Sequence, residues 1–295
     1  MDQDIKKSPT TGTLSEELGK DLLSIVIPCY NDYSYITISV NSALQQNWEH
    51  KEIIIVDDGS SDKTKKVLQK LESENVKVIT QQNQGTSAAR NRGIELAKGK
   101  YILVLDSDDY FEPDFSKKAI AVLNSREDIK LVTCFGRWFV SEKKSVIHKP
   151  SGGNINSFLY ECGAFGSTLF LKKDWEIVNG YDEAMKLGYE DWEFYIRLLE
   201  KGGKAHVIPE VLFHYRKKKI SRNSRANNLK HEIRKYIFLK HGKLYIEDFE
   251  MFVGTITSLL QQQLDENKRL RHKPDYRIGN YLLLPFRKIK NLIFN

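Results

Sequence analysis

Two aspartates stand two residues apart, directly after a short apolar run. Asp106 and Asp108 flank Ser107, and the run before them covers residues 101–105. Two carboxylates at this spacing can offer oxygen ligands to a hard divalent cation such as Mg²⁺ or Mn²⁺. A cation held there would bridge a diphosphate and keep open positions for water. The spacing equally allows a solvated acidic turn in which Asp109 caps the next helix.

A second acidic pair, Asp57 and Asp58, ends another apolar run. A helix is expected to begin just after it, where Ser61 or Asp62 would be a good N-cap. Capping accounts for Asp62 but not for both Asp57 and Asp58. An acidic residue at a strand end can instead accept hydrogen bonds from a base or a ribose, as in other nucleotide-binding sheets.

The elements that carry these residues follow a regular alternation. Nearly continuous apolar runs at 22–29, 52–56, 76–79 and 101–105 are typical of strands buried on both faces. Between the first two runs, and again between the last two, apolar residues recur at helical spacing, and the second of these helices closes at Gly99. This order predicts a parallel sheet with right-handed crossovers, whose ligands collect at the carboxyl ends of the strands.

The second half of the chain is less regular. Candidate strands at 130–140, 167–171, 204–208 and 211–215, with a helix at 191–200, predict a mixed sheet. From residue 227 onward the pattern is helical and basic.

Composition excludes several classes of protein. With 40% hydrophobic and 11% aromatic residues among 295, the chain is too apolar for disorder and long enough to bury a core. Its apolar runs are far shorter than the ~20 residues that span a bilayer. Residues 1–210 hold 27 basic and 32 acidic side chains, whereas 211–295 hold 19 and 7. The net charge of +7 therefore belongs to the tail and does not indicate a nucleic-acid partner.

The N-terminus and the cysteines predict a cytoplasmic location. Residues 1–21 are polar and lack the apolar stretch of a secretory signal, so we expect a flexible leader and no export. Cys29, Cys134 and Cys162 are an odd number without close spacing. This argues against a disulfide framework or a cysteine-based zinc site and suits a reducing compartment.

Together, the strand-end motifs resemble those of the family 2 glycosyltransferases. They are SIVIPCYN at 24–31, EIIIVDDGS at 52–60, NQG at 83–85 with ARN at 89–91, and LDSDD at 105–109. Each motif is weak alone, but four in this order are specific, and the resemblance covers roughly residues 22–216.

The resemblance implies a GT-A type α/β fold with three parts after the leader. A Rossmann-like nucleotide-binding parallel sheet at 22–110 continues into a mixed acceptor-side sheet at 111–220. A basic helical extension follows at 221–295. A nucleotide-sugar donor and a bound Mn²⁺ or Mg²⁺ are implied as well.

The resemblance also assigns donor binding to residues near the strand ends. These are Pro28, Tyr30, Asn31, Asp58, Asn83, Gly85, Arg90, Asp106 and Ser107. Pro28 and Tyr30 would line the base pocket, and Asp58 would bond to the base. Asp106 would hold the ribose or the metal, and Asp108 is the foremost metal candidate. For Arg90, a solvent-exposed charge on a helix face is an equal alternative.

In the acceptor half, Asp191 matches the catalytic base of the family, with Glu190 and Trp192 in support. A carboxylate there can take the proton of an acceptor hydroxyl while that oxygen attacks the anomeric carbon opposite the departing diphosphate, which inverts this centre. The alternative is an ordinary helix N-terminus, which favours acidic residues through its exposed amides.

His214 alternates with apolar residues in a predicted strand. In related enzymes a residue near this place completes the metal shell, and a structural histidine is an equal alternative here. The basic run 217–219 departs from the familiar pattern. With Ser221 and Arg222 it would suit a loop that closes over the diphosphate.

The last residues form an amphipathic, cationic pattern. Arg287, Lys288 and Lys290 alternate with apolar residues between 284 and 294. Such a helix can lie on an anionic membrane surface, here the inner face of the cell membrane, or pack its apolar face on the domain.

The leading hypothesis is a metal-dependent, inverting transferase that moves a sugar, with a UDP-sugar favoured as donor, to a hydroxyl of a growing cell-surface polysaccharide or lipid-linked glycan. One alternative is a metal-dependent phosphohydrolase or nucleotidyltransferase, which is weaker because there is no Walker-type phosphate loop. Another is a non-catalytic adaptor that binds membranes or polyanions through its basic tail. The donor sugar, the acceptor and the oligomeric state are not predicted.

Overall fold

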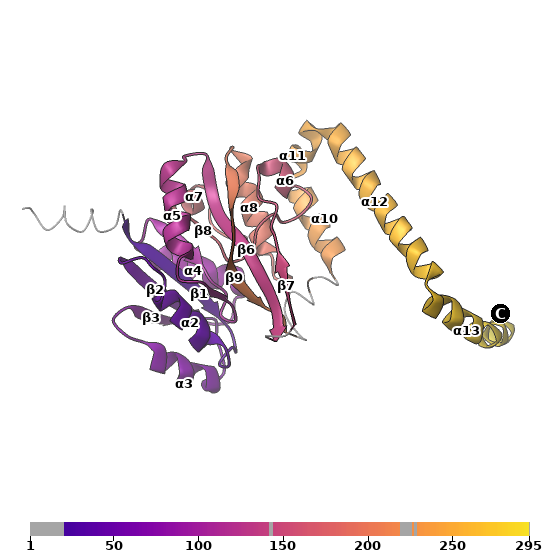
Figure 1. Ribbon diagram of the computed structural model, residues 1–295, viewed down its shortest axis with the longest axis horizontal. Helices are drawn as coiled ribbons and strands as arrows, with labels where there is room; N and C mark the ends of the chain where they lie inside the picture. Colours follow the sequence, from indigo (N-terminus) through magenta and orange to yellow (C-terminus); the bar gives the residue numbers. More distant parts are fainter. Residues whose placement is uncertain (1–20, 142–143, 219–225, 227–228, 295) are drawn as a thin grey trace, which may run out of the picture. The chain divides into compact units, whose positions relative to one another are not determined.

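The computed structural model describes residues 21–141, 144–218, 226 and 229–294, with side chains up to residue 285 (Figure 1). The leader predicted at 1–21 lies almost wholly outside these residues. The chain divides into two compact units, one ending at Arg234 and the other beginning at Lys235. We describe each unit by itself.

The described part of the first unit holds a nine-stranded mixed sheet. Its order is β3-β2-β1-β4-β8-β6-β9-β5, and β7 pairs with β6. The parallel strands are β1 (Leu23–Cys29), β2 (Lys51–Asp57), β3 (Val76–Thr80) and β4 (Tyr101–Val104). The strands beyond them are β5 (Tyr110–Phe111), β6 (Ile129–Ser141), β7 (Lys144–His148), β8 (Leu169–Leu171) and β9 (Lys204–Arg216). Because β8 is antiparallel to both β4 and β6, the predicted continuation of a parallel sheet into a mixed one is confirmed.

Helices connect the parallel strands, as predicted. They are α2 (Ile36–Leu44), α3 (Asp62–Leu71) and α4 (Thr86–Leu96). Helix α4 packs closely on β1 and β2 at Gly93, where a Cβ would stand 2.4 Å from Cγ1 of Val26 and 3.1 Å from Cγ2 of Val56. This close approach holds α4 against the strand ends.

The second half contributes α5 (Phe115–Ser125), α6 (Ile155–Phe158), α7 (Lys172–Ile177) and α8 (Glu190–Glu200). The two strands predicted at 204–208 and 211–215 are a single strand, β9. Pro209 interrupts its ladder, because proline has no N–H to donate. The register against β6 accordingly jumps from Ile208 opposite Cys134 to Val211 opposite Phe135.

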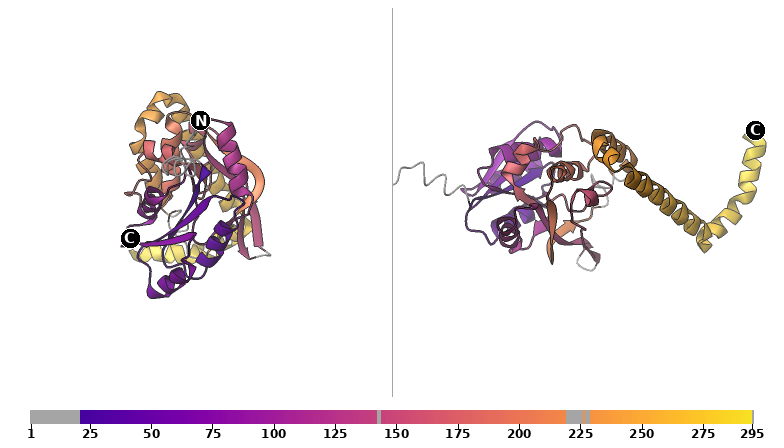
Figure 2. Two further views of the ribbon diagram at one scale, coloured as in Figure 1. Left: turned by 90° about the vertical axis from the view of Figure 1, so that its left-hand side faces the viewer. Right: turned by 90° about the horizontal axis from the view of Figure 1, so that it is seen from above.

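The core lies on the strands. Every residue of β1 and β4 is buried, which is the pattern of parallel strands covered on both faces. The strands can be followed by colour from β1 in indigo to β9 in orange (Figures 1 and 2). Because β1, β2, β3 and β4 are parallel, the polar segments that follow them all lie at the carboxyl ends of these strands. This is the side of the sheet where the motifs were expected to meet.

The described chain from residue 229 is helical, as predicted. Its elements are α10 (Lys230–Lys240), α11 (Gly242–Glu247), α12 (Phe249–His272) and α13 (Pro274–Phe294). No residue of α12 is buried. Among the described helices, none combines the length and the apolar character that crossing a membrane requires.

Candidate active site

The two carboxylates at the end of β2, Asp57 and Asp58, organise different loops. Asp57 closes the local turn, since its Oδ1 accepts a hydrogen bond from the backbone N of Ser60 at 2.9 Å. Asp58 instead holds the loop after β3. Its Oδ1 accepts from the backbone N of Gln84 and its Oδ2 from that of Gly85, both at 2.8 Å. Gly85 has φ +93°, a backbone conformation that glycine adopts without strain, at the start of α4.

The other residues predicted for the donor side surround this loop. Tyr30 is 54% exposed just after β1, whereas Pro28 is buried within the strand. Asn31 joins the ends of β1 and β2, because its Oδ1 accepts from the backbone N of Ser61 at 2.8 Å. Asn83 is exposed at the same edge. Tyr30 and Asn83 are thus both exposed near the carboxyl ends of the strands, where the resemblance places the base and the ribose.

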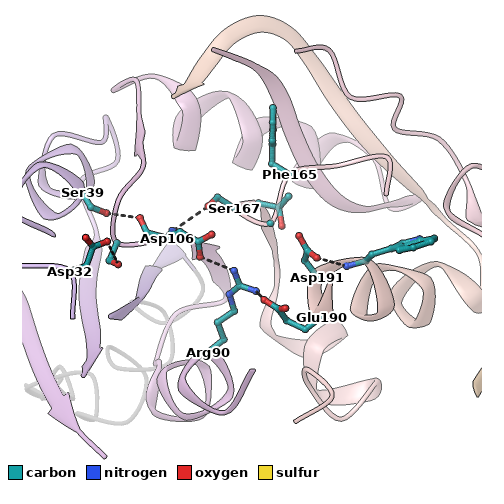
Figure 3. Close-up of polar contacts among 12 residues, drawn as sticks. Asp32, Ser39, Arg90, Asp106, Phe165, Ser167, Glu190 and Asp191 are labelled. Carbon is teal, nitrogen blue, oxygen red and sulfur yellow. Dashed lines mark hydrogen bonds and ion pairs between the residues drawn. The ribbon is translucent and has the colours of Figure 1, made fainter. Parts of the chain in front are cut away.

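Arg90 joins the two halves of the domain. Its guanidinium donates to Oδ1 of Asp106 and to Oε1 of Glu190, each at 2.7 Å (Figure 3). The side chain is only 1% exposed, so the alternative of a solvent-exposed helix charge is wrong. Burial alone would lower the pKa of Arg90, but the carboxylates of Asp106 and Glu190 outweigh it and hold this pKa well above its usual value.

The backbone of Asp106 is fixed on both sides, as Figure 3 shows. Its N–H donates to Oγ of Ser167 at 3.2 Å, and its carbonyl accepts from Oγ of Ser39 at 3.1 Å. Ser167 precedes β8, so the acceptor-side sheet holds the strand end in place. The Asp106 side chain remains 33% exposed and can still meet a ligand.

Asp32 is a site residue that the sequence analysis missed. Its carboxylate accepts from Oγ of Ser107 at 3.0 Å and from Nζ of Lys218 at 3.1 Å. The same ammonium lies 2.9 Å from Oδ2 of Asp108. Burial opposes the charge on Lys218, yet Asp108 and then Asp32 outweigh it and raise the pKa of this lysine. The signal in the sequence was a further acid at a strand end, directly after Asn31.

The predicted ligand set of Asp106, Asp108 and His214 is not assembled. Among the described residues, no three His, Cys, Asp or Glu side chains are placed to hold a metal ion. Asp106 contacts Arg90, and Asp108 contacts Lys218. The carboxylates of Asp108 and Asp32 nonetheless already hold one cation, an ammonium, with the oxygen ligands that Mg²⁺ or Mn²⁺ prefers. The two carboxylates fit a divalent ion, whereas Nε2 of His214 faces the carboxylate of Glu112.

The contacts of His214 are typical of a structural histidine. Its Nε2 lies 2.7 Å from Oε1 of Glu112, and its ring stacks on Tyr110 with the centroids 4.3 Å apart. Burial lowers its pKa, although the Glu112 carboxylate acts in the opposite direction. The imidazole therefore packs in the sheet as a largely buried, neutral group.

This burial predicts a pH dependence of stability. The unfolded imidazole binds a proton near pH 6.5, whereas the folded one resists it to a lower pH. The stability that His214 contributes is present at pH values above the pKa of its imidazole in the unfolded chain. It is lost as the pH falls toward the lower pKa of the same imidazole in the folded protein. We expect the free energy of unfolding to fall less between pH 7.5 and 5.5 in His214→Gln than in the unsubstituted protein.

Urea denaturation at three pH values measures this slope. His50→Gln is the control, because His50 is exposed. An unchanged slope in His214→Gln would contradict the prediction.

Asp191 stands at the second position of α8 and points toward the donor side (Figure 3). Its Oδ1 accepts from the backbone N of Trp192 at 2.8 Å. Trp192 is buried, and its indole Nε1 donates to the carbonyl of Phe158. Glu190 is held by Arg90. The predicted supporting residues thus lie where they fix the start of α8.

Gly166 borders the Asp191 carboxylate, and the sequence analysis did not single it out. A Cβ at this position would stand 2.9 Å from Oδ2 of Asp191 and 3.5 Å from Nη2 of Arg90. Only a residue without a side chain fits this close to the carboxylate. A glycine between Phe165 and Ser167, in a loop before a strand, was the available signal.

Gly166→Ala is expected to lower the transferase activity that the resemblance predicts about 10- to 100-fold, because its methyl group would push the Asp191 carboxylate out of position. The melting temperature and the KM for the donor should change little, since the carboxylate is the flexible end of a side chain. Gly254→Ala, in α12 with nothing within 4 Å, is the control for adding a methyl group. Steady-state kinetics decides, and an unaltered kcat in Gly166→Ala would refute the expected displacement.

Comparison with known proteins now identifies the family. The model described as "Glycosyl transferase family 2" matches residues 24–177, which include both acidic strand-end motifs. The chain belongs to glycosyl transferase family 2. A second model, described as "N-terminal domain of galactosyltransferase", matches residues 154–241, which include Asp191. Family membership favours the glycosyltransferase prediction over the phosphohydrolase and the adaptor.

Relatives of this family 2 chain are named for the synthesis of chondroitin, hyaluronan and teichuronic acid. The putative teichuronic acid biosynthesis glycosyltransferase TuaG of Bacillus subtilis is 40% identical over 203 residues, 67% of this chain and 79% of the relative. The chondroitin synthase of Escherichia coli is 30% identical over 200 residues, 63% of this chain and 28% of the relative. The chain spans only 19–28% of the chondroitin and hyaluronan synthases that it matches.

A solved structure confirms the fold of this family 2 chain. Residues 1–349 of Staphylococcus aureus TarS match with a TM-score of 0.57 at 21% identity, over 66% of this chain and 60% of that one. The predicted GT-A type architecture is therefore confirmed.

Proposed function

We propose that this family 2 chain is a metal-dependent, inverting glycosyltransferase that moves a sugar from a UDP-sugar to a hydroxyl of a growing polysaccharide or lipid-linked glycan. One observation carries the proposal. Buried Arg90 ties Asp106, at the donor edge of the sheet, to Glu190, the neighbour of Asp191. A group that binds the donor and a group that accepts a proton are thereby held in one rigid site.

The donor and the acceptor are supported by similar proteins. TarS has been solved with UDP and with UDP-GlcNAc. The Escherichia coli relative WfaP, 30% identical over 200 residues and matched over 77% of its length, is named a UDP-Glc:alpha-D-GlcNAc-diphosphoundecaprenol beta-1,3-glucosyltransferase. These names favour a UDP-sugar donor and a polysaccharide or lipid-linked acceptor.

In the proposed reaction, the Asp191 carboxylate takes the proton of the acceptor hydroxyl. The oxygen of that hydroxyl forms a bond to the anomeric carbon as the bond from this carbon to the diphosphate breaks on the opposite face. Gly166 lies against this carboxylate, since a Cβ there would stand only 2.9 Å from Oδ2 of Asp191.

The donor end must neutralise the charge that develops on the departing UDP. Asp108, with Asp32 or Asp106, would hold Mn²⁺ or Mg²⁺, which stabilises a leaving diphosphate as a Lewis acid. Arg90 keeps the Asp106 carboxylate in a fixed orientation. Asp58 holds the Gln84–Gly85 backbone beside the donor edge.

A ligand panel tests this function. We expect the melting temperature to rise with UDP-sugars in the presence of Mn²⁺, because a ligand that binds only the folded state stabilises it. The same UDP-sugar should release UDP when a polysaccharide or lipid-diphosphate acceptor is added. A shift with GDP- or dTDP-sugars alone would refute the UDP donor, and phosphate release without sugar transfer would refute the transferase.

We also propose that α13 contacts an anionic membrane surface. Ile278, Tyr281 and Leu282 share one face of the helix and are 61%, 80% and 63% exposed. The side chains of Arg287, Lys288 and Lys290 lie outside the described residues, and the sequence adds these three cationic residues to the same helix. Cosedimentation with vesicles containing phosphatidylserine should be lost in Ile278→Ser/Leu282→Ser. Equal binding to uncharged vesicles, or by this variant, would overturn the proposal.

A further inference from the structure

One cation already occupies the acidic pocket beside β4. The ammonium of Lys218 lies 2.9 Å from Oδ2 of Asp108 and 3.1 Å from both carboxylate oxygens of Asp32. Lys218 and Asp32 are 186 residues apart in sequence. The three side chains are 28%, 24% and 12% exposed, so the cluster is largely withdrawn from water.

These two carboxylates need a cation. Asp32 and Asp108 converge on the same ammonium, and like charges this close and this buried repel each other unless a positive charge stands between them. Asp106 cannot relieve the repulsion, because its carboxylate is also negative and is committed to Arg90. The pocket is therefore a cation site that the protein itself fills.

The ammonium can leave without unfolding its surroundings. The backbone before Lys218 is anchored, since the N–H of Arg216 donates to Asp109 and that of Lys217 to the carbonyl of Phe139, both at 2.8 Å. Lys218 itself reaches the carboxylates through a flexible four-carbon stem. Rotation about that stem opens the pocket while the end of β9 stays in place.

We propose that Lys218 is the resident cation of the donor-free enzyme, that the divalent metal displaces it, and that Asp32 is a ligand of that metal together with Asp108. The inference rests on the metal dependence proposed above. A divalent ion bound to these oxygens would repel the ammonium, because both are positively charged, so the two cannot share the pocket. Metal binding without donor is then weak, because the metal must first break two ion pairs.

The neighbouring lysine provides a matched control. The ammonium of Lys217 lies over the ring of Trp138, 4.3 Å from its centroid. Lys217→Met therefore removes the same charge one residue away from the acidic pocket.

The experiment measures Mn²⁺ binding to the full chain without donor, by electron paramagnetic resonance of the free ion. Lys218→Met should bind Mn²⁺ about tenfold more tightly than the unsubstituted protein, because no ammonium competes. Lys217→Met should match the unsubstituted protein, and Asp32→Asn should bind more weakly. Mn²⁺ should also raise the melting temperature of Lys218→Met more than that of Lys217→Met.

Two results would overturn the inference. Either Lys218→Met and Lys218→Gln bind Mn²⁺ no more tightly than the unsubstituted protein, or Asp32→Asn binds it equally well. If the unsubstituted protein still binds Mn²⁺ with UDP and transfers sugar, only this inference fails. If it neither binds Mn²⁺ with UDP nor transfers sugar, the proposed metal-dependent function fails.

Discussion

Replacing Arg90 by methionine is expected to lower the free energy of unfolding by about 3–5 kcal/mol, because one change breaks two ion pairs, one of them with the buried carboxylate of Glu190. Sugar transfer should fall at least about 100-fold, since Asp106 and the start of α8 lose their common anchor. Urea denaturation and a UDP-release assay measure the two effects.

Arg92→Met is the matched control for this change. Arg92 lies on the same helix, but its ion pair with Glu95 is exposed, and losing it should cost less than about 1 kcal/mol. The double variant Arg90→Met/Glu190→Gln should regain part of the lost stability, because the buried negative charge of Glu190 is gone. If Arg90→Met were as stable and as active as Arg92→Met, the central role of this residue would be rejected.

Replacing Asp191 by asparagine should lower kcat by about 10²- to 10⁴-fold, because the amide cannot take the proton of the acceptor hydroxyl. Its size and its place in the first turn of α8 are preserved. The melting temperature and the shift produced by a UDP-sugar should therefore change little. Acceptor-dependent UDP release, followed at saturating donor, gives kcat.

The competing interpretation of Asp191 is a helix N-terminal acid that contributes only stability. Asp62→Asn tests it, because Asp62 is exposed in the first turn of α3. This control should lose about 0.3–1 kcal/mol of stability and no activity. If Asp191→Asn behaves like Asp62→Asn, the residue stabilises a helix and is not the base.

Most of the fold followed from short-range patterns. The apolar runs predicted β1 to β4 within one or two residues at each end, and apolar residues at helical spacing located α2 and α4. This works because burial on both faces requires continuous apolar strands, and a helix covering them must repeat its apolar positions every three to four residues. Such patterns could not show that β9 is one strand. An irregularity within a strand, here at Pro209, looks the same in sequence as a gap between two strands.

The site was less predictable than the fold. The motifs located Asp58, Asp106 and Asp191. In the structure, however, the Asp58 carboxylate accepts hydrogen bonds from the backbone of the loop after β3. His214 was open to two interpretations, and only the tertiary structure shows that its Nε2 lies against the Glu112 carboxylate, which favours the structural one. Asp32 and Gly166 were missed, because nothing in their own neighbourhoods marks what they face.

The sequence by itself determined the order of the elements, the family and the edge of the sheet where chemistry is concentrated. These depend on periodicity and on motifs a few residues long. Only the tertiary structure decided which charges meet, as Arg90 with Glu190 across 100 residues and Lys218 with Asp32 across 186. The reason is physical: the strength of a buried ion pair depends on distance and on the exclusion of water, and packing creates both only after distant segments have come together.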